Sequence, residues 1–398
     1  MRVARWFLSA FLSSKPASRC WSYQHNLIPT QLEQVIPLSS QPKIQLNDIS
    51  LAFIREWLLV EPAEATVTPT EKNIDLLQEA MSTFYNQPPN YAKAEKLLTQ
   101  TIEVWKDQPV DELAALYRIR ADCFMALQQP SQAKDDYSRT IELLKGPGGD
   151  QADPNELPIA YLGRARAIRS SSNSAADQAA KDYQMSLRLS SREEWDTDRE
   201  NEEDGAASNP YATWEWGTSL RNAGNFREAA SIHEMAGKFF ESIGDRARSV
   251  ISQIDAGIDL AIATGNDDDG VLAKAIERSK GVESRDVALL QRVIAKEGEG
   301  RMALASVLWS NPSTRPDAEN QLGEACLRLD QLEADSIIRA QRGEGRIGGQ
   351  SLKFSIDDQP GAGLSCSRFK NQKFLSDTMK WPVSLQSKML KLENLENQ

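Results

Sequence analysis

The sequence predicts an all-α protein built from about five to six helical hairpins. The stretch from Asp111 to Lys145 indicates this most directly, because two runs of helical periodicity in it are separated by a short turn. The turn is Gln128-Gln129-Pro130-Ser131, in which we expect Ser131 to cap the second helix. The positions that share one face are Tyr117, Arg120, Ala121 and Phe124 in the first run, and Ala133, Tyr137 and Thr140 in the second. One such hairpin cannot bury its apolar face alone, so the pattern predicts similar neighbours.

Two hairpins with this spacing flank the hairpin from Asp111 to Lys145. The upstream hairpin turns at Pro88-Pro89-Asn90, and its first helical face predicts that the array begins near Thr70. The downstream hairpin is expected to begin at Asp153-Pro154, because proline suits the first position of a helix. The residues that repeat the pattern are Ile74, Leu77, Met81, Tyr85, Ala94, Leu98 and Thr101 upstream, and Tyr161, Arg164, Ala165, Ile168, Ala179, Tyr183 and Ser186 downstream.

The second half of the chain continues the pattern in three further pairs. The fourth pair has small residues where two helices would meet, which favours a close approach of their backbones. The fifth, from Ser249 to Lys280, follows the pattern more loosely, with Gly257 facing Ala275 across the loop. The positions in the fourth and sixth pairs are Trp216, Gly217, Leu220, Gly224, Asn225, Phe226, Ala229 and Ala236, then Met302, Ala305, Ser306, Trp309, Ala318, Leu322 and Ala325.

The order of large, small and aromatic positions in these hairpins resembles the tetratricopeptide repeat (TPR) family. The resemblance implies a right-handed superhelical solenoid that binds other proteins. Its repeats depart from the family in length, because the second-helix alanines at 94, 133, 179 and 229 lie farther apart than the family period of 34 residues. Long helices or extended loops are therefore expected.

The segments outside the array have a different composition. Residues 33–69 contain four prolines and are expected to be a linker with one short helix, and the array is expected to span residues 70–335. Glycine-rich residues 336–372 predict a flexible linker, and residues 373–398 predict an amphipathic helix around Trp381-Pro382. A TPR protein ending in such a Trp-Pro element is similar to a group found in plastids of plants and algae.

Residues 1–32 have the composition of an organelle transit peptide, with Arg2, Arg5, Lys15 and Arg19 and no acid before Glu33. A secretory signal, alone or joined to a transit segment, is the alternative, as is a segment without a targeting role. Together with the resemblance, this predicts a plastid (chloroplast) protein, with the mitochondrion as the alternative.

Composition limits the function classes. A net charge of −11 disfavours nucleic acid as a partner, and no apolar run is long enough for a transmembrane span, although peripheral membrane association stays open. Cys20, Cys123, Cys326 and Cys366 show no paired or metal-ligand spacing, which favours a reducing compartment. With only two histidines, His25 and His233, we expect no catalytic site, no metal and no cofactor, and a packing role for His233.

The resemblance also implies a binding groove, because the first helix of each TPR hairpin lines the concave face. Carried onto this chain, the inward positions form the predicted partner-binding groove: Arg118, Asp122, Arg166, Arg169, Tyr211, Trp214, Arg221 and Asn222. Arginine holds a carboxylate through two parallel hydrogen bonds, and exposed aromatic residues anchor interfaces. An acidic or C-terminal peptide is therefore the expected ligand; the alternative is that these arginines only cover apolar neighbours.

The sequence thus favours a non-enzymatic protein–protein interaction scaffold that assembles or maintains a complex in the organelle. A structural subunit permanently buried in a larger complex is the alternative. RNA binding is disfavoured because the repeats share packing residues, whereas a base-reading groove repeats polar ones.

Overall fold

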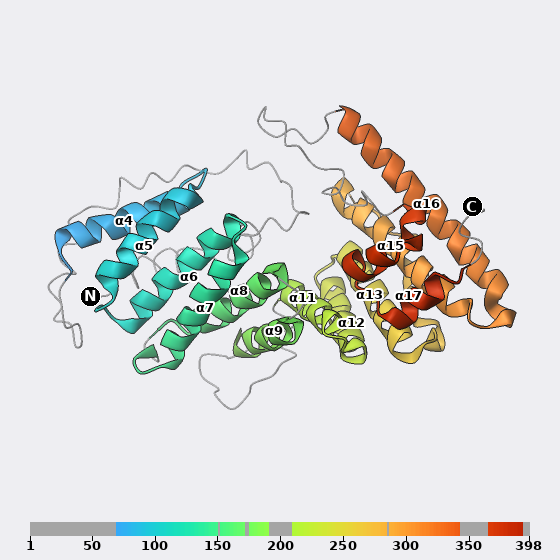
Figure 1. The fold of residues 1–398 in the computed structure, drawn as a ribbon, viewed down its shortest axis with the longest axis horizontal. Coiled ribbons are helices and arrows are strands. Elements are labelled where there is room, and N and C mark those ends of the chain that lie inside the picture. The colour runs from blue at the N-terminus through green and yellow to red at the C-terminus, as the bar shows by residue number, and fades with distance from the viewer. Residues whose placement is uncertain are drawn as a thin grey trace. The chain divides into compact units, whose positions relative to one another are not determined.

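The computed structural model describes residues 69–149, 152–171, 175–190, 209–284, 286–342 and 365–392, and all regular elements in these ranges are helices (Figure 1). The predicted all-α class is therefore confirmed. The chain divides between Ser171 and Ser172 into two compact units. The predicted transit peptide (1–32) and its linker up to residue 68, including the expected short helix, lie outside the described residues.

In the first unit, each helix packs on the next one along the chain. The array begins where the sequence predicts, because the Thr70 hydroxyl accepts a hydrogen bond from the backbone N–H of Asn73 at the start of the first helix. Asn90 caps the second helix through the backbone N–H of Lys93. The helices are α4 (Glu71–Tyr85), α5 (Tyr91–Trp105), α6 (Val110–Ala126), α7 (Pro130–Lys145) and α8 (Glu156–Ser171).

Two predicted helix starts in this unit are wrong. Helix α7 begins at Pro130, so Ser131 lies within its first turn and does not cap it. Proline at the first position explains the shift, since that position has no intrahelical partner for a backbone N–H. Helix α8 begins at Glu156 instead of Pro154, because the Asp153 carboxylate accepts a hydrogen bond from the backbone N–H of Asn155 and forms a turn first.

In the second unit, consecutive helices also pack on one another, and α13 additionally contacts α15. Its two longest helices, Val287–Leu308 and Arg315–Arg342, run antiparallel (Figure 1). The helices are α9 (Ala176–Ser190), α11 (Pro210–Asn222), α12 (Phe226–Ser242), α13 (Arg246–Thr264), α14 (Val271–Ser279), α15 (Val287–Leu308) and α16 (Arg315–Arg342), with short 3₁₀ turns η5 (Asp268–Gly270) and η6 (Pro312–Thr314).

Small residues hold neighbouring helices close together, as the spacing predicts. A Cβ atom at Gly217 of α11 would lie 2.6 Å from the His233 ring of α12, and one at Gly257 of α13 would lie 2.8 Å from the Leu272 Cα of α14. In the first unit, a Cβ atom at Gly163 would lie 2.4 Å from the Tyr137 ring. Real Cβ atoms do not approach so closely, so glycine is required for this packing.

The C-terminal predictions are corrected in three respects. The helical pattern does not end at residue 335, because α16 continues to Arg342. Residues 343–364 of the expected linker 336–372 lie outside the described residues, and the end of the linker is a 3₁₀ helix, η8 (Cys366–Lys370), whose Phe369 is fully buried. Over its described part, up to residue 392, the expected helix 373–398 is a π-helical turn, η9 (Phe374–Thr378), followed by the short α17 (Val383–Met389).

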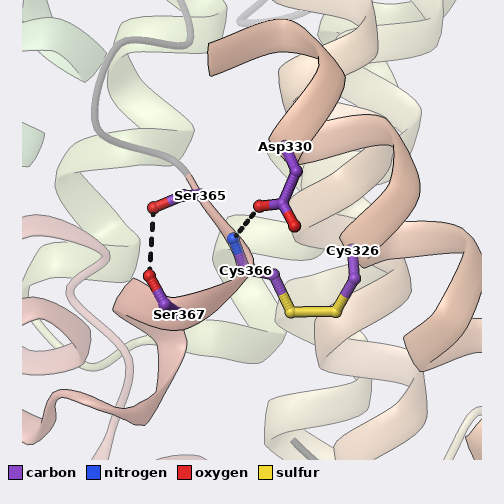
Figure 2. Close-up of a disulfide and its surroundings, with 5 residues drawn as sticks. All are labelled: Cys326, Asp330, Ser365, Cys366 and Ser367. Atoms are coloured by element: carbon purple, nitrogen blue, oxygen red, sulfur yellow. Dashed lines mark hydrogen bonds between the residues drawn. A yellow bond between two sulfur atoms is a disulfide. The ribbon is translucent and has the colours of Figure 1, made fainter. Parts of the chain in front are cut away.

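The expectation of unpaired cysteines is wrong, because Cys326 and Cys366 form a disulfide across 40 residues of sequence (Figure 2). The reducing compartment stays a prediction. Cys326 lies on α16 and Cys366 begins η8. Their pairing depends on how the C-terminal segment packs, so it left no spacing signal in the sequence. Cys123 is a buried free thiol, and burial raises its pKa.

Candidate functional site: two buried arginine networks

The eight predicted groove residues lie on α6, α8 and α11, each of which is the first helix of a predicted hairpin. Four of them belong to two buried networks of charged side chains, one in each unit. We call these the Arg118 network (Arg118, Asp122, Tyr137 and Glu156) and the Arg221 network (Trp214, Arg221, His233, Asp255, Asp259, Lys296 and Glu299).

In the Arg118 network one guanidinium serves two carboxylates. Arg118 Nε donates to Glu156 Oε2 at 2.6 Å, and its Nη1 donates to Asp122 Oδ2 at 2.9 Å. The hydroxyl of Tyr137 donates to the other oxygen of Asp122 at 2.5 Å. Because Arg118 belongs to α6, Tyr137 to α7 and Glu156 to α8, the network joins three successive helices.

The Arg118 network has two carboxylates and one arginine, and this imbalance affects the pKa values of its groups. Burial raises the pKa of Asp122, and the negative charge of Glu156 adds to this effect, whereas Arg118 and Tyr137 oppose it. Burial also raises the pKa of Tyr137, as does the charge of Asp122. Burial disfavours the charged form of Arg118, but the attraction of Glu156 and Asp122 outweighs it and raises the arginine pKa.

In the Arg221 network several donors converge on two aspartates of α13. Arg221 Nε donates to Asp259 Oδ1 at 2.5 Å, and its Nη1 donates to Asp255 Oδ1 at 2.8 Å. The indole N–H of Trp214 donates to Asp255 Oδ2 at 3.0 Å, and the ammonium of Lys296 donates to Asp255 Oδ1 at 3.0 Å. The network thereby joins α11, α13 and α15.

Two cations therefore meet Asp255. Burial alone would raise the pKa of this carboxyl, but Lys296 and Arg221 outweigh it and hold the pKa far below its usual range. Burial likewise disfavours the charge on Lys296, whose pKa is nevertheless raised by Asp255 and Glu299. Asp255 is 1% exposed, so its charge depends on these partners rather than on water.

His233 completes the Arg221 network from α12. It is fully buried, and its Nδ1 lies 2.7 Å from Asp259 Oδ2, which confirms the predicted packing role and adds a polar one. Its Nε2 lies 3.4 Å from the Thr218 hydroxyl, which donates to the backbone carbonyl of Trp214. The Asp–His–Thr order resembles a catalytic relay, but the hydroxyl proton is directed to a carbonyl and the imidazole is closed off from solvent. We assign these groups to packing.

The other four predicted groove residues, on α8 and α11, are half-buried. Arg166 and Arg169 are half-buried on α8, and the positive charge of Arg166 acts on the Tyr137 hydroxyl. Tyr211 is half-buried on α11, where the Phe240 ring packs edge-on against it at 5.0 Å and the Arg248 guanidinium lies over it at 5.1 Å. Asn222 is the last residue of α11. Contact of these residues with a partner stays a prediction.

Sequence reasoning missed most of the acids in the two networks: Glu156 in the first, and Asp255, Asp259 and Glu299 in the second. Asp255 and Asp259 lie one helical turn apart on α13 among buried apolar residues such as Ile254 and Ile258. Carboxylates on the apolar face of a helix require cations from neighbouring helices, and this signal was available in the sequence. Which cations pair with these carboxylates depends on how the helices pack.

Two features of the described residues bear on other functions. No group of three or more His, Cys, Asp or Glu side chains there is arranged to hold a metal ion. None of the helices in the described ranges has both the length and the apolar character needed to cross a membrane. Comparison of the sequence with models of known protein families and with curated proteins gives no match.

Proposed function

We propose that this chain is a helical-repeat scaffold of tetratricopeptide type that binds a protein or peptide. The observation that carries the proposal is a buried small–large–small triad, spaced i, i+4 and i+7, that recurs in five second helices of the predicted hairpins. Its members are Ala94, Leu98 and Thr101 of α5, Ala133, Tyr137 and Thr140 of α7, Ala179, Tyr183 and Ser186 of α9, Ala229, His233 and Ala236 of α12, and Ala318, Leu322 and Ala325 of α16, all 4% exposed or less. A triad repeated in this way packs each hairpin on its neighbour.

In this proposal each arginine network supports a rigid surface within its own unit. Arg118 and Arg221 are 11% and 10% exposed and are paired with carboxylates of their own chain, so their part is to fix neighbouring first helices in position. Arg166 and Arg169, which are half-buried on α8, are the proposed ligand contacts. Each has a partner within the chain, but a guanidinium carries five donors and can serve a second acceptor.

The ligand proposed is a peptide carboxylate, and a fluorescent peptide with an acidic free C-terminus is the probe. We expect the full-length chain to bind it, and the amidated peptide to bind at least about tenfold more weakly, since a charge-assisted pair is lost. Replacing both arginines (R166E/R169E) should abolish binding without changing helicity. The matched control is K134E/R139E, which makes the same charge change at exposed positions of α7 in the same unit.

Fluorescence anisotropy measures the affinity, and circular dichroism checks the helicity. Equal binding by R166E/R169E and by the control would overturn the groove assignment on α8. Equal loss in both variants would show that net charge, and not a site, attracts the peptide.

The alternative proposal, a permanently buried structural subunit, has one observation in its favour. Leu327 of α16 is 66% exposed, and Val383 and Leu390 near the C-terminus are 71% and 42% exposed. Sedimentation of the purified full-length chain separates the two proposals: a scaffold should remain a soluble monomer, whereas an obligate subunit should aggregate through exposed apolar surface.

The location proposed is a plastid. A fluorescent fusion of residues 1–60 expressed in a photosynthetic cell should enter plastids. Accumulation in mitochondria would support the alternative organelle, and retention in the cytosol would contradict import altogether.

A further inference from the structure

The C-terminal segment (residues 365–392, containing η8, η9 and α17) completes the apolar core of the second unit. Its buried side chains join one cluster with residues of α13, α15 and α16. Phe369, Leu375 and Met389 are fully buried, and Trp381, Leu385 and Leu392 are 2–3% exposed. In Figure 1 this segment, drawn in red, lies against α15 and α13. Without the segment, the apolar side chains that it covers would face water.

Polar contacts near its two ends help to hold the C-terminal segment in place. The backbone N–H of Cys366 donates to Asp330 Oδ1 of α16 at 2.9 Å (Figure 2). The ammonium of Lys388 donates to the carbonyl oxygen of Gly265, at the end of α13, at 2.8 Å. The Ser306 hydroxyl of α15 donates to the Met389 sulfur at 3.0 Å. These contacts are at the two ends of the segment, and between them its buried apolar side chains pack into the core of the unit.

One polar group opposes closure. The indole N–H of Trp381 is buried, and the described residues offer it no hydrogen-bond acceptor. A buried donor without an acceptor is destabilising, and opening of the segment would return this donor to water. When the segment covers the unit, its apolar side chains are favourably buried, but the indole N–H of Trp381 is buried at a cost. Opening of the segment would relieve that cost.

The disulfide adds a covalent restraint at the point where the segment begins. Two covalent paths link Cys366 to α16. One is its disulfide bond to Cys326, and the other is the intervening chain, over a sequence separation of 40. A cross-link that closes a loop of this length strongly reduces the number of open conformations. Its removal should therefore favour opening of the segment.

We propose that the Cys326–Cys366 disulfide is a redox-controlled latch, which holds the C-terminal segment over the apolar faces of α13, α15 and α16 and releases it on reduction by a dithiol. A thiolate of the dithiol attacks one sulfur, and a mixed disulfide forms as the other sulfur leaves as a thiolate. The second thiol of the reductant then displaces the first protein sulfur. Two electrons and two protons pass to the protein, which gains two thiols, while the dithiol becomes a disulfide.

Hydrogen exchange of the full-length chain, followed by mass spectrometry with and without dithiothreitol, tests the latch. On reduction we expect the opening equilibrium of residues 365–392 to rise by about 10- to 1,000-fold, from the loop entropy that the cross-link removes. Exchange in α4 and α5 of the first unit should not change. Binding of a dye that fluoresces on apolar surfaces should increase in parallel.

The double variant C326S/C366S is the matched control. It should exchange like the reduced wild-type protein and should not respond to dithiothreitol, which separates the latch from other effects of the reductant. Should this variant fail to fold, alkylation of the wild-type chain gives an independent measurement: Cys326 and Cys366 should react only after reduction, whereas buried Cys123 should stay protected in the folded protein.

Three outcomes would overturn the proposal. Alkylation of Cys326 and Cys366 without reductant would show that no disulfide forms. Unchanged exchange of the segment after reduction would show that apolar packing alone holds it. An equal rise of exchange in the segment, α15 and α16 would show that the disulfide stabilises the whole unit instead of controlling one segment.

Discussion

The Arg118 network of the first unit and the Arg221 network of the second solve the same packing problem with different charge balances. In each, an arginine of one helix reaches a carboxylate 38 positions later, on the helix that follows after one intervening helix. The intervening helix adds a ring from the same position of its buried triad, namely Tyr137 of α7 or His233 of α12. Each network therefore connects three successive helices through one arginine, and the Arg221 network reaches a fourth, α15, through Lys296.

The difference lies in the number of cations near each carboxylate. Asp122 shares Arg118 with Glu156, and its pKa is raised, whereas Asp255 meets both Arg221 and Lys296, and its pKa is lowered. Burial is similar at the two sites, so the partners decide the direction. A buried carboxylate is thus a poor or a strong acid according to how many cations the packing brings to it.

The largest expected effect follows removal of Arg221. The substitution Arg221→Met leaves Asp255 and Asp259 buried without their shared cation, which should cost about 3–5 kcal/mol of the free energy of unfolding. Urea denaturation of the full-length chain, with unit-resolved hydrogen exchange, measures the loss. Lys238→Met on α12 is the control, because its side chain is 70% exposed in a surface pair with Glu234 and should contribute less than about 1 kcal/mol. Equal losses in the two variants would contradict a stabilising role of the Arg221 network.

Removal of Arg118 should have a smaller effect. The pKa of Asp122 is already raised, so this carboxyl can take up a proton when its cation is lost, and we expect Arg118→Met to cost about 2–3 kcal/mol at pH 7. Because Asp122 is protonated more readily at pH 5, the loss of stability should be smaller there than at pH 7. Unfolding measurements at both pH values test this. A loss that is the same at pH 5 and pH 7 would contradict the predicted proton uptake.

The glycine contacts with the two rings come next in size. A Cβ atom added at Gly163 would overlap the Tyr137 ring, and one at Gly217 would overlap the His233 ring. Each alanine substitution should destabilise its own unit by about 1–3 kcal/mol through overpacking. Gly281→Ala is the matched control, because its nearest contact is the end of the Arg246 side chain at 3.4 Å. Unit-resolved hydrogen exchange should place each effect in one unit only.

The smallest expected effect is a difference in pH dependence. For Asp122 the folded-state pKa is raised, so the stability that its carboxyl contributes is greatest at low pH and falls as the pH rises from about 4 through the folded-state pKa. For Asp255 the folded-state pKa is lowered, so its contribution is complete above pH of about 4 and is lost as the pH falls below that value.

Asparagine variants make this difference measurable. Relative to Asp122→Asn, the wild-type chain should lose on the order of 1 kcal/mol between pH 4 and pH 7, as one raised carboxyl ionises. Relative to Asp255→Asn, it should keep a constant advantage over that range and lose it only below pH of about 4. Urea titrations at matched ionic strength measure both differences, and parallel curves for the two variants would refute the distinction.

Helical periodicity predicted most of the fold because local spacing determines which residues can share a helix face. The start at Thr70, the contact of Gly217 with the second helix of its pair and the burial of His233 followed from spacing alone. The start of α7 was misplaced by two residues, since its cap position is Gln129 and not Ser131, because the first-position preference of Pro130 overrode the capping preference of Ser131. Local competition of this kind moves a helix end but leaves the helix in place.

Spacing gave less information about the candidate site. It identified Arg118 and Arg221 as unusual but placed them towards a ligand, because the carboxylates that hold them lie on helices far along the chain. Asp255 and Asp259 were visible as acids within an apolar helix, yet their cations were not. The choice between pairing within the chain and pairing with a ligand is made by distances that no sequence pattern contains.

By itself, the sequence determined the helices, their small-residue contacts and their order, since these depend on side-chain size and periodicity along one segment. Only the tertiary structure decided which arginine meets which aspartate, that Cys326 pairs with Cys366, and that the C-terminal segment covers the apolar faces of α13, α15 and α16. Those features depend on residues distant in the chain being brought within a few ångströms. Packing sets such distances, and with them the charge state of each buried group.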